Sequence, residues 1–238
     1  MGAGPVTAAF FNFAPSMVRR AVPGCWDIVA PPTLCRVRAI AAADALGEVC
    51  GVSSRTALLE ALPLLRRTVA ACDGAGRPLA GANRSLWPAI ATALGTGGLG
   101  EAWQACTTLR EHRGDGHVAA LVTHGVRGLE SHLLAAGVRG VPAEVLRENR
   151  GWSEEQWEAS AAALAGRGLL HTDGRATDAG RTLHASVETT TDTLAAPAYV
   201  TLSDGALEDL YGALRACAAE IQTSGLYPFP NPMGLPAL

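Results

Sequence analysis

The stretch 141–180 constrains the fold of this chain more than any other, because residues that start and stop helices recur in it at short intervals. A short helical pattern ends at Arg150-Gly-Trp152, and the following Ser153-Glu-Glu-Gln156 matches a capping box at a helix N-terminus. Asp173-Gly174 is typical of a tight β-hairpin turn, and Thr177 is a residue type that caps helices. The pattern therefore predicts a short helix, a turn, a longer helix, a hairpin and a final helix.

This order of elements, preceded by a helix over 116–136 with Gly137 as its C-cap, is that of a winged helix-turn-helix. We therefore expect a mainly α protein in three consecutive parts. They are a helical subdomain over 1–111, a winged helix-turn-helix with a small two-stranded wing over 112–196, and a C-terminal helix with a proline-rich tail over 197–238. A fold of this kind does not by itself decide function.

Apolar spacing and capping residues predict further helices in the N-terminal half of the chain. Between the last of these and the helix-turn-helix, Gly114 and Gly116 predict a break in the backbone. The expected helices span 33–50, 53–72 with a cap at Ser53 or Ser54 and a bend at Pro63, 85–94, and 101–111.

Composition excludes two classes of protein. The chain is 48% hydrophobic and 17% charged, so it can bury a core and is not a solvated disordered tail. Its net charge is −3 and its isoelectric point about 6.1, whereas a general polyanion binder needs a basic face. All 19 basic residues are arginines, so an anion site would have to come from a local cluster of guanidinium groups.

The cysteines and histidines indicate neither disulfides nor a metal site. The six cysteines form no CxxC pair and no zinc-like spacing, which predicts reduced, buried thiols in a cytoplasmic protein. No run of about 18 apolar residues is present to span a membrane. The histidines are too scattered to share a metal, and no nucleotide-binding fingerprint occurs, so we expect no metal and no cofactor.

The charges of the expected recognition helix suit DNA badly. Such a helix enters the major groove with its N-terminal turns, and here those turns carry Glu154, Glu155 and Glu158. From Ala143 to Gly180 there are seven acidic residues and four arginines, which gives a net charge of −3. Carboxylates also stabilise a helix N-terminus, but each one near a phosphate is repulsive. We therefore expect that DNA is not the partner.

The stretch Gly168–Gly180, which reads Gly-Leu-Leu-x3-Gly-Arg-x-Thr-x2-Gly, resembles the wing region of MarR-type proteins. More widely, nearly the whole chain resembles a poorly characterised bacterial family of MarR-like helix-turn-helix proteins, some of them found near biosynthetic genes. The segments that carry this resemblance are Val6–Pro15, Gly76–Leu79 with Asn83, Leu109–Ala120, Arg150–Ser153 and the wing.

Members of that family usually carry a further segment before the equivalent of Phe11-Asn12-Phe13, so the resemblance implies a missing layer at the start of this chain. The apolar, aromatic start implies the same, because exposed aromatic patches are normally covered. We expect a small partner protein, or a second copy of the chain, to cover the segment. A misassigned start codon is the alternative.

The segment Arg110–His117 is the one densest in chemistry, and we interpret it as a glycine-hinged turn between two helices. The N–H groups that open the second helix could then receive an anion. Arg110 and Arg113 offer planar guanidinium groups suited to sulfate, phosphate or carboxylate. The alternative is that these arginines pair with Glu111 and Glu101.

Three side chains of this segment, His112, Asp115 and His117, could transfer protons near neutral pH. We predict them as catalytic residues, with the alternative that Asp115 only caps the following helix. Phe11, Asn12 and Trp26 are candidate substrate contacts, although such aromatic residues more often belong to a core. Asn12 is of interest because a buried amide needs hydrogen-bond partners.

The function favoured by these features is a cofactor-independent biosynthetic enzyme, or catalytic subunit, on a winged-helix scaffold that does not bind DNA. The expected reaction is a base-assisted elimination or an intramolecular cyclisation of a natural-product-type small molecule, with expulsion of an anion such as sulfate or phosphate. The alternatives are a MarR-like ligand-responsive transcriptional regulator, and a resistance protein that sequesters a ligand without turnover.

Overall fold

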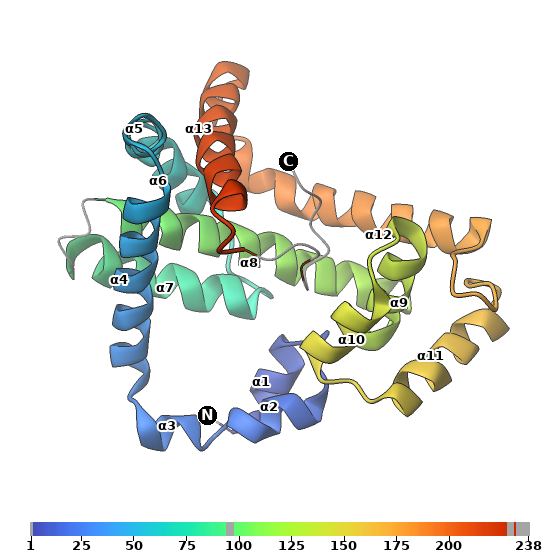
Figure 1. The fold of residues 1–238 in the computed structure, drawn as a ribbon. Helices are drawn as coiled ribbons and strands as arrows, with labels where there is room; N and C mark the ends of the chain where they lie inside the picture. Colours follow the sequence, from blue (N-terminus) through green and yellow to red (C-terminus); the bar gives the residue numbers. More distant parts are fainter. Residues whose placement is uncertain (1, 94–97, 228–230, 232–238) are drawn as a thin grey trace. The chain divides into compact units, whose positions relative to one another are not determined.

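The computed structural model describes residues 2–93, 98–227 and 231, and Figure 1 shows that most of this part of the chain is helical, which confirms the mainly α fold. No helix among the described residues is long and apolar enough to cross a bilayer. Most of the proline-rich tail lies outside the described residues. The elements are α1 (Ala3–Ala9), α2 (Pro15–Ala21), α3 (Cys25–Ile28), α4 (Pro31–Val49), α5 (Val52–Glu60), α6 (Leu62–Ala71), α7 (Pro78–Ala93), α8 (Leu99–Thr123), α9 (Gly128–Arg139), α10 (Ala143–Arg150), α11 (Glu154–Gly166), α12 (Asp178–Ala195), the 3-10 turn η1 (Ala196–Tyr199) and α13 (Asp204–Thr223).

Contacts divide the chain into two compact units, and each is built from segments far apart in the sequence. Within the described residues, the first unit contains 2–28 and 117–192, and the second contains 29–116 and 193–227. Helices α8 and α12 each contribute to both units. The N-terminal helices α1 to α3 therefore belong to the same unit as the helix-turn-helix.

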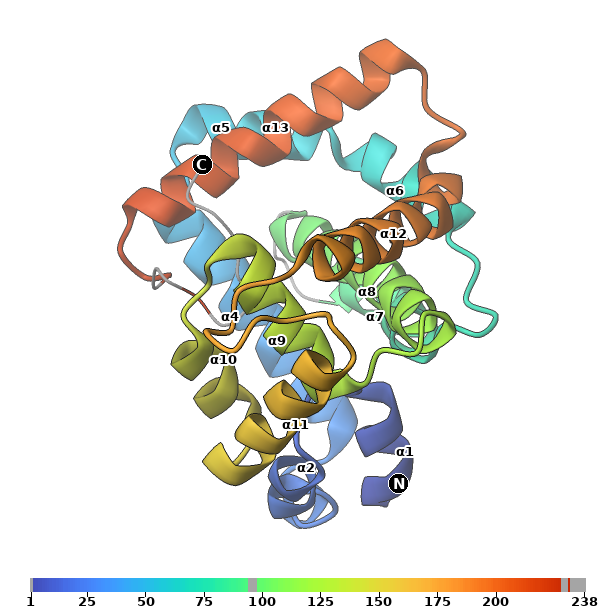
Figure 2. The same cartoon turned by 90° about the vertical axis from the view of Figure 1, so that its right-hand side faces the viewer.

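The helix-turn-helix of the first unit consists of α9, α10 and α11, and a turn leads from α11 to α12 (Figure 2). The capping box at α11 is confirmed, because the Gln156 N–H donates to Ser153 Oγ at 3.2 Å and the Ser153 N–H donates to Gln156 Oε1 at 3.1 Å. Thr177 caps α12, since its hydroxyl oxygen accepts the Gly180 N–H at 3.1 Å. The apolar faces of these helices meet in one core around the fully buried Leu164.

The wing expected after α11 is reduced to a tight turn. In this part of the structure a single antiparallel bridge joins Leu170 to Ala176, and the two-stranded ribbon is not formed. Gly174 has a φ of 83°, a backbone conformation that glycine adopts without strain. The Ala176 N–H donates to the Gly137 carbonyl at 3.1 Å, and both bridge residues are buried. The arms are thus anchored on α9 at the bridge.

The predicted break near residue 114 does not occur, because α8 runs without interruption through both Gly114 and Gly116. A glycine inside a helix costs about 1 kcal/mol relative to alanine, which is why the pair predicted a turn. The contacts that Asp115 and Gly116 make with other helices, described below, offset this cost. The segment that carries the catalytic prediction is therefore helical.

The helix expected over 116–136 is instead divided between the end of α8 and α9, and α9 ends at Gly140, with a φ of 69°, rather than at Gly137. Gly137 lies inside α9, where a Cβ atom would come within 2.7 Å of the Gly174 carbonyl oxygen. This glycine therefore makes room for the turn after α11 and does not end the helix.

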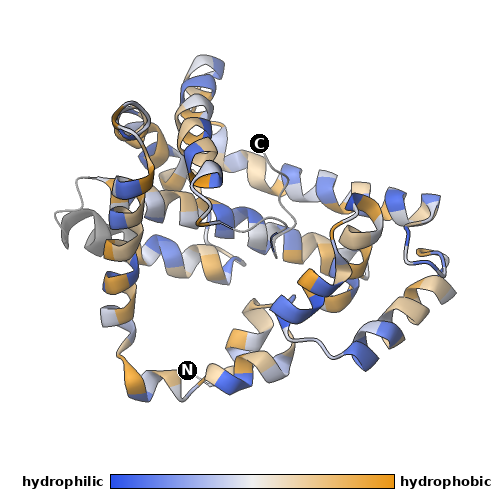
Figure 3. Ribbon diagram, viewed as in Figure 1, coloured by the Kyte–Doolittle hydropathy of each residue, from blue (hydrophilic) through white to orange (hydrophobic). Residues whose placement is uncertain are grey.

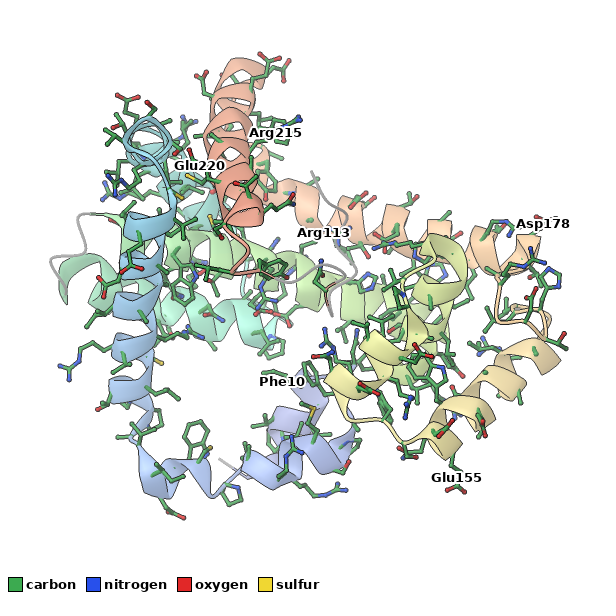
Figure 4. The ribbon with its side chains drawn as sticks, in the orientation of Figure 1. Phe10, Arg113, Glu155, Asp178, Arg215 and Glu220 are labelled. Carbon is green, nitrogen blue, oxygen red and sulfur yellow. The ribbon has the colours of Figure 1, made fainter. Side chains whose placement is uncertain are left out.

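The core of the second unit joins α5, α6 and α13 with part of α8. Gly51, rather than Ser53 or Ser54, precedes α5, and the carboxylate of Glu220 on α13 caps this helix (Figure 4). Its Oε2 atom accepts the Gly51 N–H at 2.8 Å and the Ser54 hydroxyl at 2.5 Å. The expected bend at Pro63 is a complete break at Ala61, and α7 begins at Pro78 rather than near residue 85.

Candidate active site

The predicted anion site at Arg110–His117 has no counterpart in the structure, because this segment lies inside α8. Only the first N–H groups of a helix lack a partner within that helix, and those of α8 lie near Leu99. The N–H groups near His117 are therefore engaged in the helix. Any chemistry of this segment has to come from its side chains.

Asp115 is a helix cap in this structure, but for a different helix from the one expected. Its Oδ2 atom accepts the N–H groups of Leu79 at 3.0 Å and Ala80 at 2.9 Å, at the start of α7. Pro78, the first residue of α7, has no N–H to satisfy. The side chain is buried, and burial raises the pKa of Asp115 despite the two hydrogen bonds. The carboxylate thus holds α7 on α8 within the second unit.

Arg77 also connects α7 to α8, and its position explains why residue 116 is a glycine. The guanidinium group donates to the carbonyl oxygens of His112 and, at 2.7 Å, of Leu194. A Cβ atom on Gly116 would come within 2.9 Å of Arg77 Nη1, so the glycine leaves room for the arginine. The His112 ring is buried, and burial followed by the charge of Arg77 lowers its pKa. We therefore assign His112 and Arg77 to the packing of the second unit.

The two predicted anion-binding arginines lie in different surroundings. Arg110 pairs with Glu111, as the alternative interpretation expected, and burial raises the pKa of this glutamate while the Arg110 charge lowers it. Arg113 is exposed (Figure 4) and lies near Tyr199, where burial raises the tyrosine pKa and the arginine charge opposes the shift. The structure does not bring these arginines together around a common ligand position.

The N-terminal aromatic segment is docked on the helix-turn-helix of the first unit. The backbone carbonyl of Asn12, rather than its amide side chain, accepts hydrogen bonds from His132 Nε2 at 3.1 Å and Trp152 Nε1 at 3.0 Å. Phe11 packs on the core, and a Cβ atom on Gly128 would come within 2.0 Å of the Phe11 carbonyl oxygen. This chain's own α9 and α10 therefore cover part of the segment expected to need a partner, and the partner itself stays a prediction.

Trp26, the remaining candidate contact, lies on the short helix α3 of the first unit. Its indole N–H is buried and has no hydrogen-bond partner among the described residues.

His117 is the predicted catalytic residue whose surroundings suit proton transfer. Its Nδ1 atom lies 3.0 Å from Thr191 Oγ1 on α12. The Thr191 hydroxyl donates its own hydrogen to the Val187 carbonyl at 2.8 Å, so its oxygen must accept from His117 Nδ1–H. In the neutral ring the lone pair is then on Nε2, the nitrogen through which His117 could act as a general base.

A carboxylate lies near His117 in the first unit, and two further basic side chains lie near that carboxylate. Glu188 Oε1 lies 3.9 Å from His117 Nδ1 and 3.3 Å from Arg139 Nη2. His184 lies one turn before Glu188 on α12, and its pKa is lowered by burial and by Arg139, while Glu188 raises it. The side chains of His117 and Glu188 are each 25% exposed and that of Arg139 is 42% exposed, so part of each is in contact with solvent.

This cluster of His117, Arg139, His184 and Glu188, which we call the His117 cluster, can move protons and hold an anion. A carboxylate near Nδ1 stabilises the imidazolium that forms when Nε2 takes a proton. Arg139 supplies a cation beside it. Within the described ranges no group of three or more His, Cys, Asp or Glu could hold a metal ion.

The face that a helix-turn-helix would present to DNA is acidic in this protein. Glu154, Glu155 and Glu158 are exposed, Figure 3 shows hydrophilic residues at the N-terminal end of α11, and Figure 4 shows Glu155 pointing into solvent. From α10 to the start of α12 the arginines contact acids or a ring: Arg147 with Glu148 (3.7 Å), Arg150 over Phe13 (4.7 Å), Arg167 with Glu130 (3.2 Å), Arg175 with Asp173 (2.7 Å) and Arg181 with Asp178 (2.5 Å).

Comparison with known families agrees with the order of α9, α10 and α11. A family model described as a helix-turn-helix family matches residues 1–228. The chain belongs to this helix-turn-helix family. No curated protein sequence and no solved structure matches the chain. Membership of the helix-turn-helix family establishes the scaffold, whereas its use has to be argued from the side chains.

Sequence reasoning missed Arg139, His184 and Glu188, and a signal for two of them was present. His184, Glu188 and Thr191 have the i, i+4, i+7 spacing of one helix face, which would have placed them together on the helix that Thr177 caps. No local pattern connects that face to His117, because the contact joins residues 74 positions apart.

Proposed function

We propose that this protein is a small-molecule enzyme in which His117 is the general base, and that its helix-turn-helix is not used to bind DNA. One observation carries the proposal. The hydroxyl of Thr191 is committed to the Val187 carbonyl, so it fixes the proton of His117 on Nδ1 and leaves the lone pair on Nε2. Nearby Glu188 stabilises the protonated ring.

The favoured reaction remains a base-assisted elimination or intramolecular cyclisation of a natural-product-type substrate. His117 Nε2 takes a proton from the substrate, and the electrons of the broken bond to hydrogen form the new double bond or ring bond. The bond from carbon to the leaving oxygen breaks, and this oxygen departs with the electron pair as sulfate or phosphate. Arg139 holds the developing anion. Asp115 and His112, which were predicted to act with His117, have no part in this scheme.

The acidic face of α11 supports a role other than DNA reading. Contacts between protein and DNA depend on arginine and lysine side chains at the phosphates, and here the N-terminal turns of α11 carry the exposed carboxylates of Glu154, Glu155 and Glu158 instead. We further propose that the scaffold is MarR-like, in line with the resemblance of the turn after α11 to MarR-type wings. The regulator remains the second candidate because the family is a helix-turn-helix family.

The test uses His117→Asn, because an asparagine amide can still donate to Thr191 but has no atom in place of Nε2. The protein is incubated with small-molecule extracts of its source cells, and released sulfate and phosphate are measured together with the mass change of the substrate. We expect the wild type and the exposed control His171→Gln to release the anion, and His117→Asn to lose at least about 100-fold in rate.

Equal turnover by His117→Asn and the wild type would remove His117 as the base. Tight binding of a compound that is recovered unchanged would favour the sequestering protein instead. A gel-shift assay in which the protein binds the DNA upstream of its own gene, and in which this binding weakens as the salt concentration is raised, would favour the regulator.

A further inference from the structure

Two buried thiols meet in the second unit, where α13 packs on the start of α5. Cys50 is the C-cap residue of α4 and directly precedes Gly51, and Cys217 lies on α13. The two side chains are hydrogen-bonded to each other, and the Cys217 thiol also donates to the Ser54 carbonyl at 3.5 Å. Thiols held in direct contact are the starting arrangement for a disulfide.

We propose that Cys50 and Cys217 form a reversible redox pair, which a peroxide oxidises to a disulfide when α13 is transiently released from α5. The Cys50 thiolate attacks one peroxide oxygen, the O–O bond breaks, and the sulfur becomes a sulfenic acid while the other oxygen leaves as water. The Cys217 thiolate then attacks this sulfur and displaces its oxygen as a second water. Two electrons and two protons have passed from the thiols to the peroxide, and a dithiol reverses the reaction.

The pair is protected while the second unit is closed. Cys50 and Cys217 are only 3% and 5% exposed. Burial raises the pKa of both thiols, to about 12 for Cys217, whereas the hydrogen bond from Cys217 lowers that of Cys50 in part. Because the thiolate is the nucleophile, both sulfurs react slowly in this state, and Cys50 is the one that ionises first.

Glu220 holds α13 over the two sulfur atoms. It lies one turn after Cys217, and its carboxylate accepts the Gly51 N–H and the Ser54 hydroxyl. These bonds join α13 to the residues that directly follow Cys50. Loss of this cap favours the local opening in which peroxide reaches the thiols, and closure then brings the two sulfur atoms back into contact.

The disulfide would close a long loop of the chain. The segment between the two cysteines includes residues 117–192, which form most of the first unit. A cross-link between positions far apart in the sequence restricts the unfolded chain and stabilises the folded one. Oxidation therefore makes α13 harder to release. The inference concerns the second unit and does not depend on the chemistry proposed for His117.

The experiment treats the reduced chain with hydrogen peroxide, blocks the remaining thiols with iodoacetamide under denaturing conditions, and maps disulfides by mass spectrometry. Trypsin cleaves this chain only after arginine, because it contains no lysine. The tryptic peptides 39–55 and 216–238 contain Cys50 and Cys217, respectively, as their only cysteines. We expect these peptides to be linked with the loss of two hydrogen atoms, and dithiothreitol to separate them.

Cys50→Ala and Cys217→Ala should form no such link, whereas Cys72→Ala, which removes another buried thiol of this unit, should not prevent it. Glu220→Ala removes the two hydrogen bonds at the start of α5 and should form the link at least about tenfold faster. Its matched control is Glu208→Ala at an exposed position of the same helix, which should react at the wild-type rate.

Hydrogen exchange measures the consequence of the link. We expect amides of α13 to exchange at least about tenfold more slowly in the oxidised wild type than in the reduced one, with no such change in peroxide-treated Cys217→Ala. The proposal is overturned if peroxide leaves the two peptides unlinked, or if it links Cys217 to Cys106, which packs against the same core. Equal rates of linkage in Glu220→Ala and the wild type would refute the release of α13 as the step that admits peroxide.

Discussion

Mild acid should weaken the helix-turn-helix unit of this protein through one buried histidine, His132 on α9. Its ring is 7% exposed, and burial lowers its pKa from 6.5 to about 4, while the hydrogen bond to Asn12 raises it and the charge of Arg150 lowers it. The folded protein thus resists protonating a group that the unfolded chain protonates readily. Stability is fully present above the unfolded pKa of about 6.5 and is lost as the pH falls toward about 4.

The size of the effect follows from the two pKa values. Between a pH of about 7.5 and about 5, a shift from 6.5 to about 4 removes about 2 kcal/mol from the free energy of unfolding. His112 and His184 also have lowered pKa values and act in the same direction, so the wild type alone cannot isolate His132. The informative quantity is the difference in pH dependence between the wild type and a variant without the titrating ring.

His132→Gln is that variant, because the glutamine amide nitrogen lies close to the position of Nε2 and can keep the bond to the Asn12 carbonyl. Urea unfolding is measured at both pH values, and hydrogen exchange of α9 and α10 peptides reports on the first unit separately from the second. We expect His132→Gln to lose about 2 kcal/mol less than the wild type on acidification. The exposed control His171→Gln should behave as the wild type. An equal loss in His132→Gln and wild type would refute the reasoning.

Two further predictions concern packing. Asp115→Ala removes two hydrogen bonds at the start of α7 and should lower the free energy of unfolding by about 1–2 kcal/mol, measured by urea denaturation, and an unchanged value would show that Asp115 does not cap α7. Gly128→Ala would put a Cβ within 2.0 Å of the Phe11 carbonyl oxygen and should cost about 1–3 kcal/mol while increasing proteolysis of the N-terminal segment. Its matched control is Gly212→Ala on α13, where no atom lies within 4 Å of the added Cβ, and this change should stabilise the protein by about 0.5–1 kcal/mol. Equal effects of the two substitutions on the free energy of unfolding would contradict the docking of Phe11 on α9.

The amino-acid sequence determined those features that depend on residues close together in the chain. The capping box of Ser153 and Gln156, the cap at Thr177 and the turn at Gly174 were predicted from spacing and are present, because each is closed by hydrogen bonds or backbone angles within a few residues. The acidic character of the face that α11 presents follows from composition in the same way.

Tertiary structure decided the features in which a local preference and a distant contact disagree. Gly114 and Gly116 predicted a break, but Arg77, which needs the space beside Gly116, and the start of α7, which is capped by Asp115, keep α8 continuous. The candidate base likewise depends on a distant contact. The Thr191 hydroxyl of α12, 74 positions beyond His117, is hydrogen-bonded to the Nδ1 atom of His117. A helix preference of about 1 kcal/mol per residue is comparable to one or two hydrogen bonds to another helix, and the sequence alone does not say which distant partner will make them.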